Sequence, residues 1–308
     1  MSLFTVIGLT PAAPKIQVGA EIMMKLLTGV VFVVVFSVGV IAEEKAAQGS
    51  DVVYKTIDGK GLKLFLTKPA EWKGSDSRPM IVFFHGGGWT GGPVRQFENQ
   101  SKYFASRGLV CAEVEYRLAK GKEKPLVCIQ DARSAMRWLR AHAKELGIDP
   151  ERIAVGGGSA GGHLAACTGM IQGNDDPADD KSVPARPDAM LLFNPVFDNG
   201  PGGYGNERMG ADYKKYSPVH NISADDPPAI VFLGSADKLI PVKTVENFKA
   251  EMVKAGVKCE AYVYAGQVHG FFNKDPYLTE TLIESDKFLV SLGWLKGPPA
   301  LTSKLASE

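Results

Sequence analysis

Cysteine is scarce in this sequence, with four residues among 308. Cys111, Cys128, Cys167 and Cys259 form no C-x-x-C pair, and each falls within an apolar strand or helix pattern. Free cysteine is among the most buried residue types, so we expect four buried free thiols. A disulfide stays open as an alternative, because the N-terminal segment has features of an exported protein.

An excess of charge of either sign is also missing. Lys and Arg number 35, Asp and Glu number 34, and the formal net charge is +1. The two signs are interspersed and no basic stripe is visible, so we expect no nucleic-acid partner. An anionic substrate is not indicated either, and the sequence contains no internal repeat or low-complexity tract.

A spacing typical of a metal site is absent as well. The acidic cluster Asp175, Asp176, Asp179 and Asp180 offers the ligand type that Ca²⁺ takes, but it lacks the spacing of an EF-hand loop. We therefore expect a solvated loop here, and we expect neither a metal ion nor a cofactor in this protein.

One long uncharged run lies near the N-terminus, at residues 26–42. A lysine precedes it, and the small residues Val40 and Ala42 stand at the positions −3 and −1 of a cleavage site, which together indicate a secretory signal. A start at Met23 or Met24 suits such a signal better than a start at Met1.

The run is slightly short for a membrane span, and three interpretations stay open: a cleaved signal, an uncleaved anchor, or a core helix. We expect residues 1–42 to be a signal peptide or N-terminal anchor and residues 43–308 to form one domain. The protein is then exported, either periplasmic or secreted, and contacts a membrane only through that anchor. The sequence leaves the oligomeric state open.

Strands and helices alternate along the domain. The hydrophobic content of 45% suffices for one substantial core. Residues 51–56 and 62–66 form a predicted hairpin. Further strands are predicted at 80–84, 109–114, 153–156, 189–193, 229–233 and 260–264, and helices at 96–107, 129–146, 161–170, 242–255 and 280–292. This order predicts an α/β fold, with a mostly parallel eight-stranded sheet and helices on both faces.

Two irregular stretches interrupt the alternation, at residues 172–187 and 197–221. Long loops in a compact domain are usually functional. The second stretch leaves the carboxyl end of a strand, where ligands bind in open α/β sheets, so we interpret it as a short cap over the site.

The sequence Gly157-x-Ser159-x-Gly161 lies between an apolar strand and a predicted helix. This is the spacing of a nucleophile elbow, a sharp turn that lifts the serine hydroxyl above the sheet. Small neighbours are needed because the chain passes closely on both sides. The N-terminus of the following helix offers free N–H groups to a developing negative charge.

A second motif, His85-Gly86-Gly87-Gly88-Trp89, follows the predicted strand at residues 80–84. A glycine loop at this place supplies backbone N–H groups to an oxyanion hole. We expect the hole to use the N–H of Ala160 together with two from Gly86, Gly87 and Gly88.

The chain resembles the α/β-hydrolase superfamily, within it the hormone-sensitive-lipase-like carboxylesterases and their feruloyl- and acetylxylan-esterase-like relatives. The resemblance covers roughly residues 50–292 and rests on the glycine loop, the elbow, Tyr116 to Ala119, Asp131 to Leu139, Gly234 to Asp237 and Val268 to Phe271. It implies the α/β-hydrolase fold and favours Gly87 and Gly88 as oxyanion donors. One departure is Gly158, where many lipase-like members carry an acidic residue; it favours the polysaccharide-esterase branch.

A serine hydroxyl is a weak nucleophile and needs a base. His269 lies late in the chain, just after a predicted strand, where the order Ser…Asp…His requires the base. Asp237 follows the strand at residues 229–233, and we expect it to hold the imidazole in the right tautomer. Asp198 in the cap is a weaker rival for this role.

The other histidines are not expected to act as the catalytic base. We expect His85 to hold the glycine loop, His142 to be exposed on a helix, and His163 to pack or support the elbow. A substrate contact stays open for His220 in the cap. Arg117 and Asp131 are expected to form a structural ion pair.

These residues together predict a serine hydrolase that cleaves carboxylic esters through an acyl-enzyme. Aromatic residues near the site, Trp89, Tyr204 and Phe271 foremost, with Tyr213 and Phe272, favour short-chain or sugar-linked acetyl and feruloyl esters as small-molecule or carbohydrate substrates. An amide hydrolase of arylformamidase or small-peptidase type is the alternative. A catalytically dead binding module is disfavoured because every role of the triad is filled.

Overall fold

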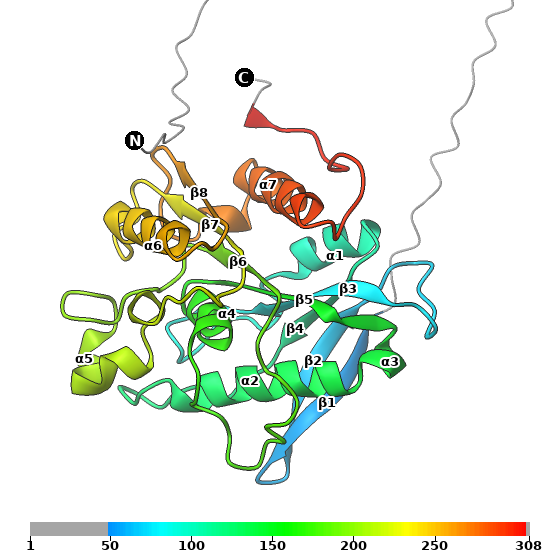
Figure 1. The fold of residues 1–308 in the computed structure, drawn as a ribbon, viewed down its shortest axis with the longest axis horizontal. Coiled ribbons are helices and arrows are strands. Elements are labelled where there is room, and N and C mark those ends of the chain that lie inside the picture. Colours follow the sequence, from blue (N-terminus) through cyan, green and yellow to red (C-terminus); the bar gives the residue numbers. More distant parts are fainter. Residues whose placement is uncertain (1–48, 306–308) are drawn as a thin grey trace, which may run out of the picture. The chain divides into compact units, whose positions relative to one another are not determined.

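The computed structural model describes residues 49–305, which form one eight-stranded sheet with helices on both faces (Figure 1). The strand order is β1-β2-β4-β3-β5-β6-β7-β8. The predicted α/β-hydrolase architecture is confirmed. The expected signal or anchor at residues 1–42 lies outside the described residues, as does the start of the predicted domain at residue 43.

The first two strands pair antiparallel, and β2 pairs antiparallel with β4, whereas the remaining neighbours are parallel. The strands are β1 (Ser50–Ile57), β2 (Lys60–Thr67), β3 (Arg78–Phe84), β4 (Val110–Val114), β5 (Ile148–Gly158), β6 (Ala189–Phe193), β7 (Ala229–Gly234) and β8 (Cys259–Tyr264). The carboxyl ends of β3, β5, β6 and β7 therefore meet at one edge, where loops gather to form a site.

The core lies in two layers because alternate side chains of each strand point to opposite faces. On β3, Ile81 and Phe83 belong to one buried cluster, and Met80, Val82 and Phe84 belong to the other. The first cluster packs under α1 (Glu98–Ser106) and α7 (Tyr277–Ser291), and the second under α2 (Leu126–Ala141), α4 (Ala160–Met170) and α6 (Val242–Lys254).

The helix predicted at residues 129–146 is in fact two helices. It begins earlier, as α2, and a break at His142 separates it from the short α3 (Ala143–Leu146). The His142 ring stacks on Trp138 with centroids 4.0 Å apart, and its Nδ1 lies 2.8 Å from the Trp138 carbonyl oxygen. His142 is therefore half-buried, and the expectation that it is exposed was wrong.

The cap at residues 197–221 contains short helical turns: α5 (Asn206–Met209), η1 (Gly210–Lys215) and η2 (Pro218–His220). Arg208 on α5 ties the cap to its surroundings, because its guanidinium donates to the carbonyl oxygens of Gly88, Gly121 and Glu123 at 2.8–3.1 Å. As expected, the cap is short, and it is hydrogen-bonded to the glycine loop through Arg208.

The prediction of a solvated acidic loop holds for the exposed Asp180 but is wrong for Asp175 and Asp176, which form ion pairs. Asp175 pairs with Arg133 and Arg137 of α2, and Asp176 pairs with Lys55 of β1 at 2.6 Å. The nearby pair of Arg117 and Asp131 is bidentate, at 2.7 and 2.8 Å, as expected. Asp175, Asp176 and Asp179 balance largely buried cations. No metal-binding group of His, Cys, Asp or Glu occurs within residues 49–305.

The four cysteines are free and buried, as predicted. Burial raises the pKa of Cys128 and of Cys259 to about 12. It raises the pKa values of Cys111 and Cys167 further still. None of the four thiols is therefore a nucleophile in the folded protein.

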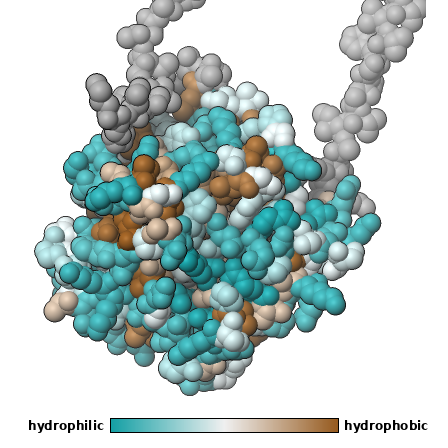
Figure 2. All heavy atoms as spheres, viewed as in Figure 1, coloured by the Kyte–Doolittle hydropathy of each residue, from teal (hydrophilic) through white to brown (hydrophobic). Residues whose placement is uncertain are grey.

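The face drawn in Figure 2 is mostly hydrophilic, and its apolar side chains gather in small patches. Within the part of the chain that the structure describes, no helix has the length and apolar character to cross a membrane.

Candidate active site

Ser159 occupies a sharp turn between β5 and α4, as the elbow motif predicts. Its backbone has φ 54° and ψ −117°, a conformation that costs an ordinary residue free energy. The surroundings hold it there: the Ser159 N–H donates to the Phe193 carbonyl oxygen at 3.0 Å, and its carbonyl oxygen accepts from the N–H of His163 at 3.0 Å. Strain of this kind places the hydroxyl above the sheet.

The glycines of the elbow are sterically required. A Cβ on Gly157 would lie 2.4 Å from the Gly161 carbonyl carbon, and a Cβ on Gly161 would lie 2.0 Å from the Phe84 carbonyl oxygen. The elbow therefore packs directly against the end of β3, from which the glycine loop leaves. The two motifs, far apart in the sequence, meet here.

Gly158, the departure from the lipase-like pattern, also has a steric reason. A Cβ at this position would lie 2.6 Å from Cζ of Phe272. The Phe272 ring packs against Phe97 and Phe193, with centroids 5.6 and 5.0 Å away. An aromatic ring thus takes the space that an acidic side chain would need.

The predicted base and acid lie together beside the elbow. His269 Nδ1 is 2.7 Å from Oδ2 of Asp237, whose side chain is fully buried. The other oxygen of Asp237 accepts from the N–H groups of Leu239 and Ile240 at 2.8 and 3.0 Å. Burial raises the pKa of Asp237, but the bonds from His269 and from these two N–H groups outweigh it and lower the pKa below its ordinary value. Asp237 is ionised at neutral pH.

Asn194, which the sequence analysis missed, contacts the base directly. It follows β6, and its Nδ2 lies 3.3 Å from Nε2 of His269. No hydrogen bond joins the Ser159 hydroxyl to His269 within residues 49–305. The one available signal was an asparagine at the carboxyl end of a buried strand next to the elbow strand.

The glycine loop presents its N–H groups unequally. The N–H of Gly86 donates to Oε1 of Gln96 at 2.7 Å, so it is occupied, and its assignment to the oxyanion hole is corrected. The N–H groups of Gly87, Gly88 and Ala160 have no acceptor among the described residues. Gly87 has φ 124°, which only glycine adopts readily, and this turns the loop toward Ser159.

A cavity of about 330 Å³ opens between these groups. Its lining combines the glycine loop, the elbow, the base and a few cap and loop residues: Gly86, Gly87, Gly88, Gly92, Pro93, Gln96, Gly158, Ser159, Asn194, Tyr204, Leu239, His269, Gly270 and Phe272. Of the aromatic residues expected near the site, Tyr204 and Phe272 line the cavity, whereas Phe271 and Tyr213 do not.

Two predicted substrate contacts lie elsewhere. Trp89 is fully buried, and its indole N–H donates to Nδ1 of His163 at 3.2 Å. Phe271 packs against Tyr264 and Tyr277, away from the cavity lining. Both residues neighbour true lining residues in the sequence, but their side chains point into the core.

The remaining histidines have structural surroundings. His85 Nδ1 lies 2.8 Å from the Gly86 carbonyl oxygen, and its ring stacks on Tyr116. His163 is fully buried, with Nε2 2.6 Å from the Tyr216 carbonyl oxygen, and burial lowers its pKa to about 4. Both support the loops around the elbow, as expected.

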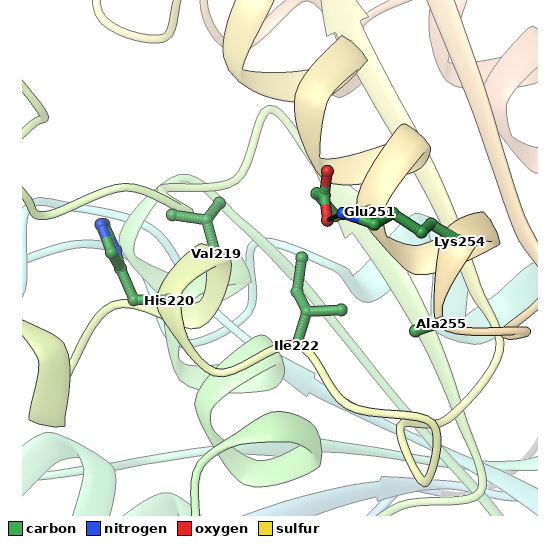
Figure 3. A pocket seen from close by; sticks show the side chains of 6 residues that line it. All are labelled: Val219, His220, Ile222, Glu251, Lys254 and Ala255. Carbon is green, nitrogen blue, oxygen red and sulfur yellow. Dashed lines mark hydrogen bonds and ion pairs between the residues drawn. The ribbon is translucent and has the colours of Figure 1, made fainter.

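His220 lies at a second cavity, of about 320 Å³, between η2 and α6 (Figure 3). Its Nδ1 lies 2.9 Å from the Ser217 hydroxyl, and its ring points away from α6. The α6 side of this cavity carries the ion pair of Lys254 and Glu251, at 2.9 Å. None of the triad residues lines this cavity, and His220 is absent from the lining of the cavity beside Ser159, so the structure gives no support to the substrate contact that the sequence left open for His220.

The fold and the arrangement of Ser159, His269 and Asp237 define the protein as an α/β-hydrolase. Comparison with known families agrees: residues 66–198 match the BD-FAE model, and residues 194–296 match the dienelactone hydrolase family.

Solved structures of a bacterial esterase are similar to the chain along nearly their whole length. Thermogutta terrifontis esterase 2, phosphoramylated by tabun, is 44% identical with a TM-score of 0.77, over 81% of this chain and 96% of that one. Among curated proteins, an arylesterase of Saccharolobus solfataricus is 30% identical over 62% of this chain and 68% of its own. The probable carboxylic ester hydrolase LipM of Mycobacterium tuberculosis is 31% identical over 61% of this chain and 47% of its own.

The chain therefore belongs to the α/β-hydrolase carboxylesterases of the hormone-sensitive-lipase-like branch. It spans about half the length of the first curated relatives that it matches.

Proposed function

We propose that the protein hydrolyses short-chain carboxylic esters through an acyl-enzyme on Ser159. One observation carries this proposal. Ser159, in its strained backbone conformation, lines a small cavity together with His269, Gly87 and Gly88, and the N–H groups of the two glycines have no acceptor among the described residues. Acyl transfer needs a nucleophile, a base and an oxyanion hole within reach of one carbonyl group.

In the first half-reaction the Ser159 hydroxyl oxygen attacks the ester carbonyl carbon, and its proton passes to Nε2 of His269. The carbonyl oxygen becomes an oxyanion that accepts from the N–H groups of Ala160, Gly87 and Gly88. When the carbon–oxygen bond breaks, His269 returns the proton to the leaving alcohol. Water then repeats the sequence on the acyl-enzyme, while Asp237 stays ionised and holds the imidazolium.

The size of the cavity supports a short acyl group. A volume of about 330 Å³ is at the lower end for ligand sites, and the rings of Tyr204 and Phe272 bound it. Structures of the similar Thermogutta esterase include propionate-bound and butyrate-bound forms. We extend the proposal to acetyl or feruloyl groups on sugars, supported by Gly158 and by the match to the BD-FAE family model.

The test is hydrolysis of p-nitrophenyl acetate, butyrate and octanoate beside acetylated xylan and methyl ferulate, with Ser159→Ala as control. We expect acetate and butyrate to be cleaved, octanoate poorly, and all activity to fall by at least about a thousandfold in the variant. Comparable activity in Ser159→Ala would overturn the mechanism. Cleavage of N-formylkynurenine or aminoacyl amides without ester cleavage would favour the amide hydrolase instead.

Paraoxon offers a direct chemical test of the nucleophile. The similar esterase has been solved phosphorylated by paraoxon. We expect the Ser159 oxygen to attack the phosphorus of paraoxon and release p-nitrophenolate, which leaves one diethylphosphoryl group per chain. Intact mass spectrometry would show one adduct on the unsubstituted protein and none on Ser159→Ala; an adduct at another residue would contradict the assignment.

We also propose that residues 1–42 direct export. Lys25, the uncharged run that follows it and the small residues at the cleavage positions support this. Expression of the full chain in a bacterial host, fractionation, and N-terminal sequencing of the product would test it. Full-length protein in the cytoplasm would contradict it.

A further inference from the structure

Asn194 occupies a position that costs conformational free energy and is firmly held. It directly follows β6, and its φ of 34° lies in the left-handed region that asparagine tolerates better than most side chains. Its own N–H donates to the Phe232 carbonyl oxygen at 2.6 Å. Although it lines the active-site cavity, only 1% of it is exposed. The fold therefore fixes where the amide lies.

The orientation of the Asn194 amide follows from a backbone donor. Its Oδ1 lies 2.9 Å from the N–H of Gly270, and a backbone N–H can only donate, so the oxygen must face it. The NH₂ end therefore faces the imidazole, with Nδ2 3.3 Å from Nε2 of His269. An NH₂ group can only donate, so it needs a lone pair on Nε2.

The opposite side of the ring requires the same tautomer. Nδ1 of His269 lies 2.7 Å from the ionised carboxylate of Asp237, which can only accept. The ring proton is thus on Nδ1 and the lone pair on Nε2. Asp237 is the one ionised side chain that forms a hydrogen bond or ion pair with this ring within residues 49–305.

We propose that Asn194 is a positioning residue that keeps Nε2 of the resting His269 unprotonated. A proton on Nε2 would point at the NH₂ group of Asn194, and two donors repel each other. The amide thereby favours the tautomer whose Nε2 lone pair is available to the Ser159 proton. During acyl transfer the Ser159 hydroxyl competes with this amide for the lone pair of Nε2. This role rests on the proposed function.

Asn194→Asp isolates the role. The substitution keeps the size of the side chain and one oxygen for the Gly270 N–H, but it replaces the donor facing Nε2 by a carboxylate oxygen, which accepts a hydrogen bond from an N–H group at Nε2. Asn273→Asp is the matched control. Asn273 lies in the loop that carries His269; its side chain donates to the Gly270 carbonyl oxygen and accepts from Nε2 of Gln96, without a hydrogen bond to the ring.

The first readout is independent of activity: ring ¹⁵N NMR at pH 7 of the full chain, with His269 assigned by loss of its signals in His269→Gln. We expect an unprotonated Nε2 in the unsubstituted protein and in Asn273→Asp, and a protonated Nε2 in Asn194→Asp. Equal ring signals in a folded Asn194→Asp, or a protonated Nε2 in the unsubstituted protein, would overturn the proposal.

The second readout is the pH profile of kcat/KM for p-nitrophenyl acetate. We expect its acidic limb to move up by about one pH unit or more in Asn194→Asp and by much less in Asn273→Asp. The same shift in both variants would mean a general charge effect and would refute the role. If the unsubstituted enzyme cleaves no ester, the proposed function fails while the NMR result still decides the role of Asn194.

Asn194→Gly covers the case in which the aspartate variant does not fold, because glycine adopts the same backbone without strain. It removes both hydrogen bonds, and we expect kcat to fall about tenfold with little change in KM, since a ring held less firmly affects the reacting complex most. An unchanged kcat would count against the positioning role.

Discussion

At the scale of single residues, Phe272 fits against the end of the elbow strand because Gly158 has no side chain. Its ring closes one side of the cavity, whereas its neighbour Phe271 packs into the core. Substituting each of these adjacent phenylalanines in turn therefore compares the same side chain in two places, one lining the cavity and one in the core.

We predict that Phe272→Leu shifts the preference of the enzyme toward longer acyl chains. Loss of the ring widens the cavity, so the ratio of kcat/KM for hexanoate to that for acetate should rise by about tenfold, since each added methylene contributes on the order of 1 kcal/mol when buried. Phe271→Leu is the control and should lower thermal stability without moving the ratio. Equal ratios in the two variants would show that Phe272 does not limit chain length.

The sequence could predict the triad but not the walls of the cavity. Ser159, Asp237 and His269 each follow a recognisable strand in an order known for this fold, and strand ends converge whatever the side chains do. Trp89 and Phe271 were misassigned because the direction of a loop side chain depends on contacts far away in the sequence. Asn194 was missed because a single asparagine carries no motif.

At the scale of elements, the cap is coupled to the oxyanion loop by one side chain of α5. Arg208 donates to the Gly88 carbonyl oxygen, and its guanidinium lies over the Trp89 ring, 5.3 Å from its centroid. The planar guanidinium donates to the three carbonyl oxygens from three separate nitrogens, whereas a lysine offers a single nitrogen. The cap therefore helps to set where the Gly88 N–H points.

We predict that Arg208→Lys lowers kcat for p-nitrophenyl acetate by about tenfold with a small change in KM, because a misplaced oxyanion donor weakens the transition state more than the ground state. Lys215→Met, which removes an exposed cation from the neighbouring η1, is the control and should leave both constants unchanged. If kcat of Arg208→Lys equals that of the control, the contact of Arg208 with the glycine loop does not affect catalysis.

Regular elements were easier to predict than their interruptions. The hairpin and the six later strands are short apolar runs bounded by turn residues, which is the clearest local signal. The break at His142 depends on how its ring stacks on Trp138, which periodicity does not reveal. The helical turns of the cap are too short to carry a periodic pattern at all.

At the scale of the whole molecule, the acidic loop links distant parts of the domain. Asp175 joins the loop to α2, and Asp176 joins it to β1. A solvated loop was predicted because the partners Lys55, Arg133 and Arg137 are remote in the sequence. Burial raises the pKa of Asp175, but the hydrogen bonds from Arg133 and Arg137 outweigh it and lower the pKa below 3.8.

A group with a lowered pKa in the folded state stabilises the protein above its unfolded pKa, and this contribution is lost as the pH falls through the folded pKa. We predict that Asp175→Asn reduces the free energy of unfolding by about 2 kcal/mol at pH 7, and that the difference shrinks below about pH 3.8. Urea unfolding at pH 7 and pH 3 measures this.

Asp225→Asn, at an exposed site outside the network, is the control for this charge change and should alter stability little at either pH. A difference for Asp175→Asn that stays constant with pH would show that its ion pairs contribute nothing. Burial raises the pKa values of Asp188, Asp226 and Glu113, and these groups act in the opposite direction, gaining stability as the pH falls.

The four buried cysteines can be used to detect local unfolding of the domain. Each thiol is inaccessible and un-ionised while the core is intact, so an alkylating reagent reacts only with chains that have opened. Because the thiols belong to different strands and helices, mass spectrometry after a brief iodoacetamide pulse would show which part of the domain opens first. Simultaneous labelling of all four would indicate a single cooperative unit, and a lead by one cysteine would identify the weakest element.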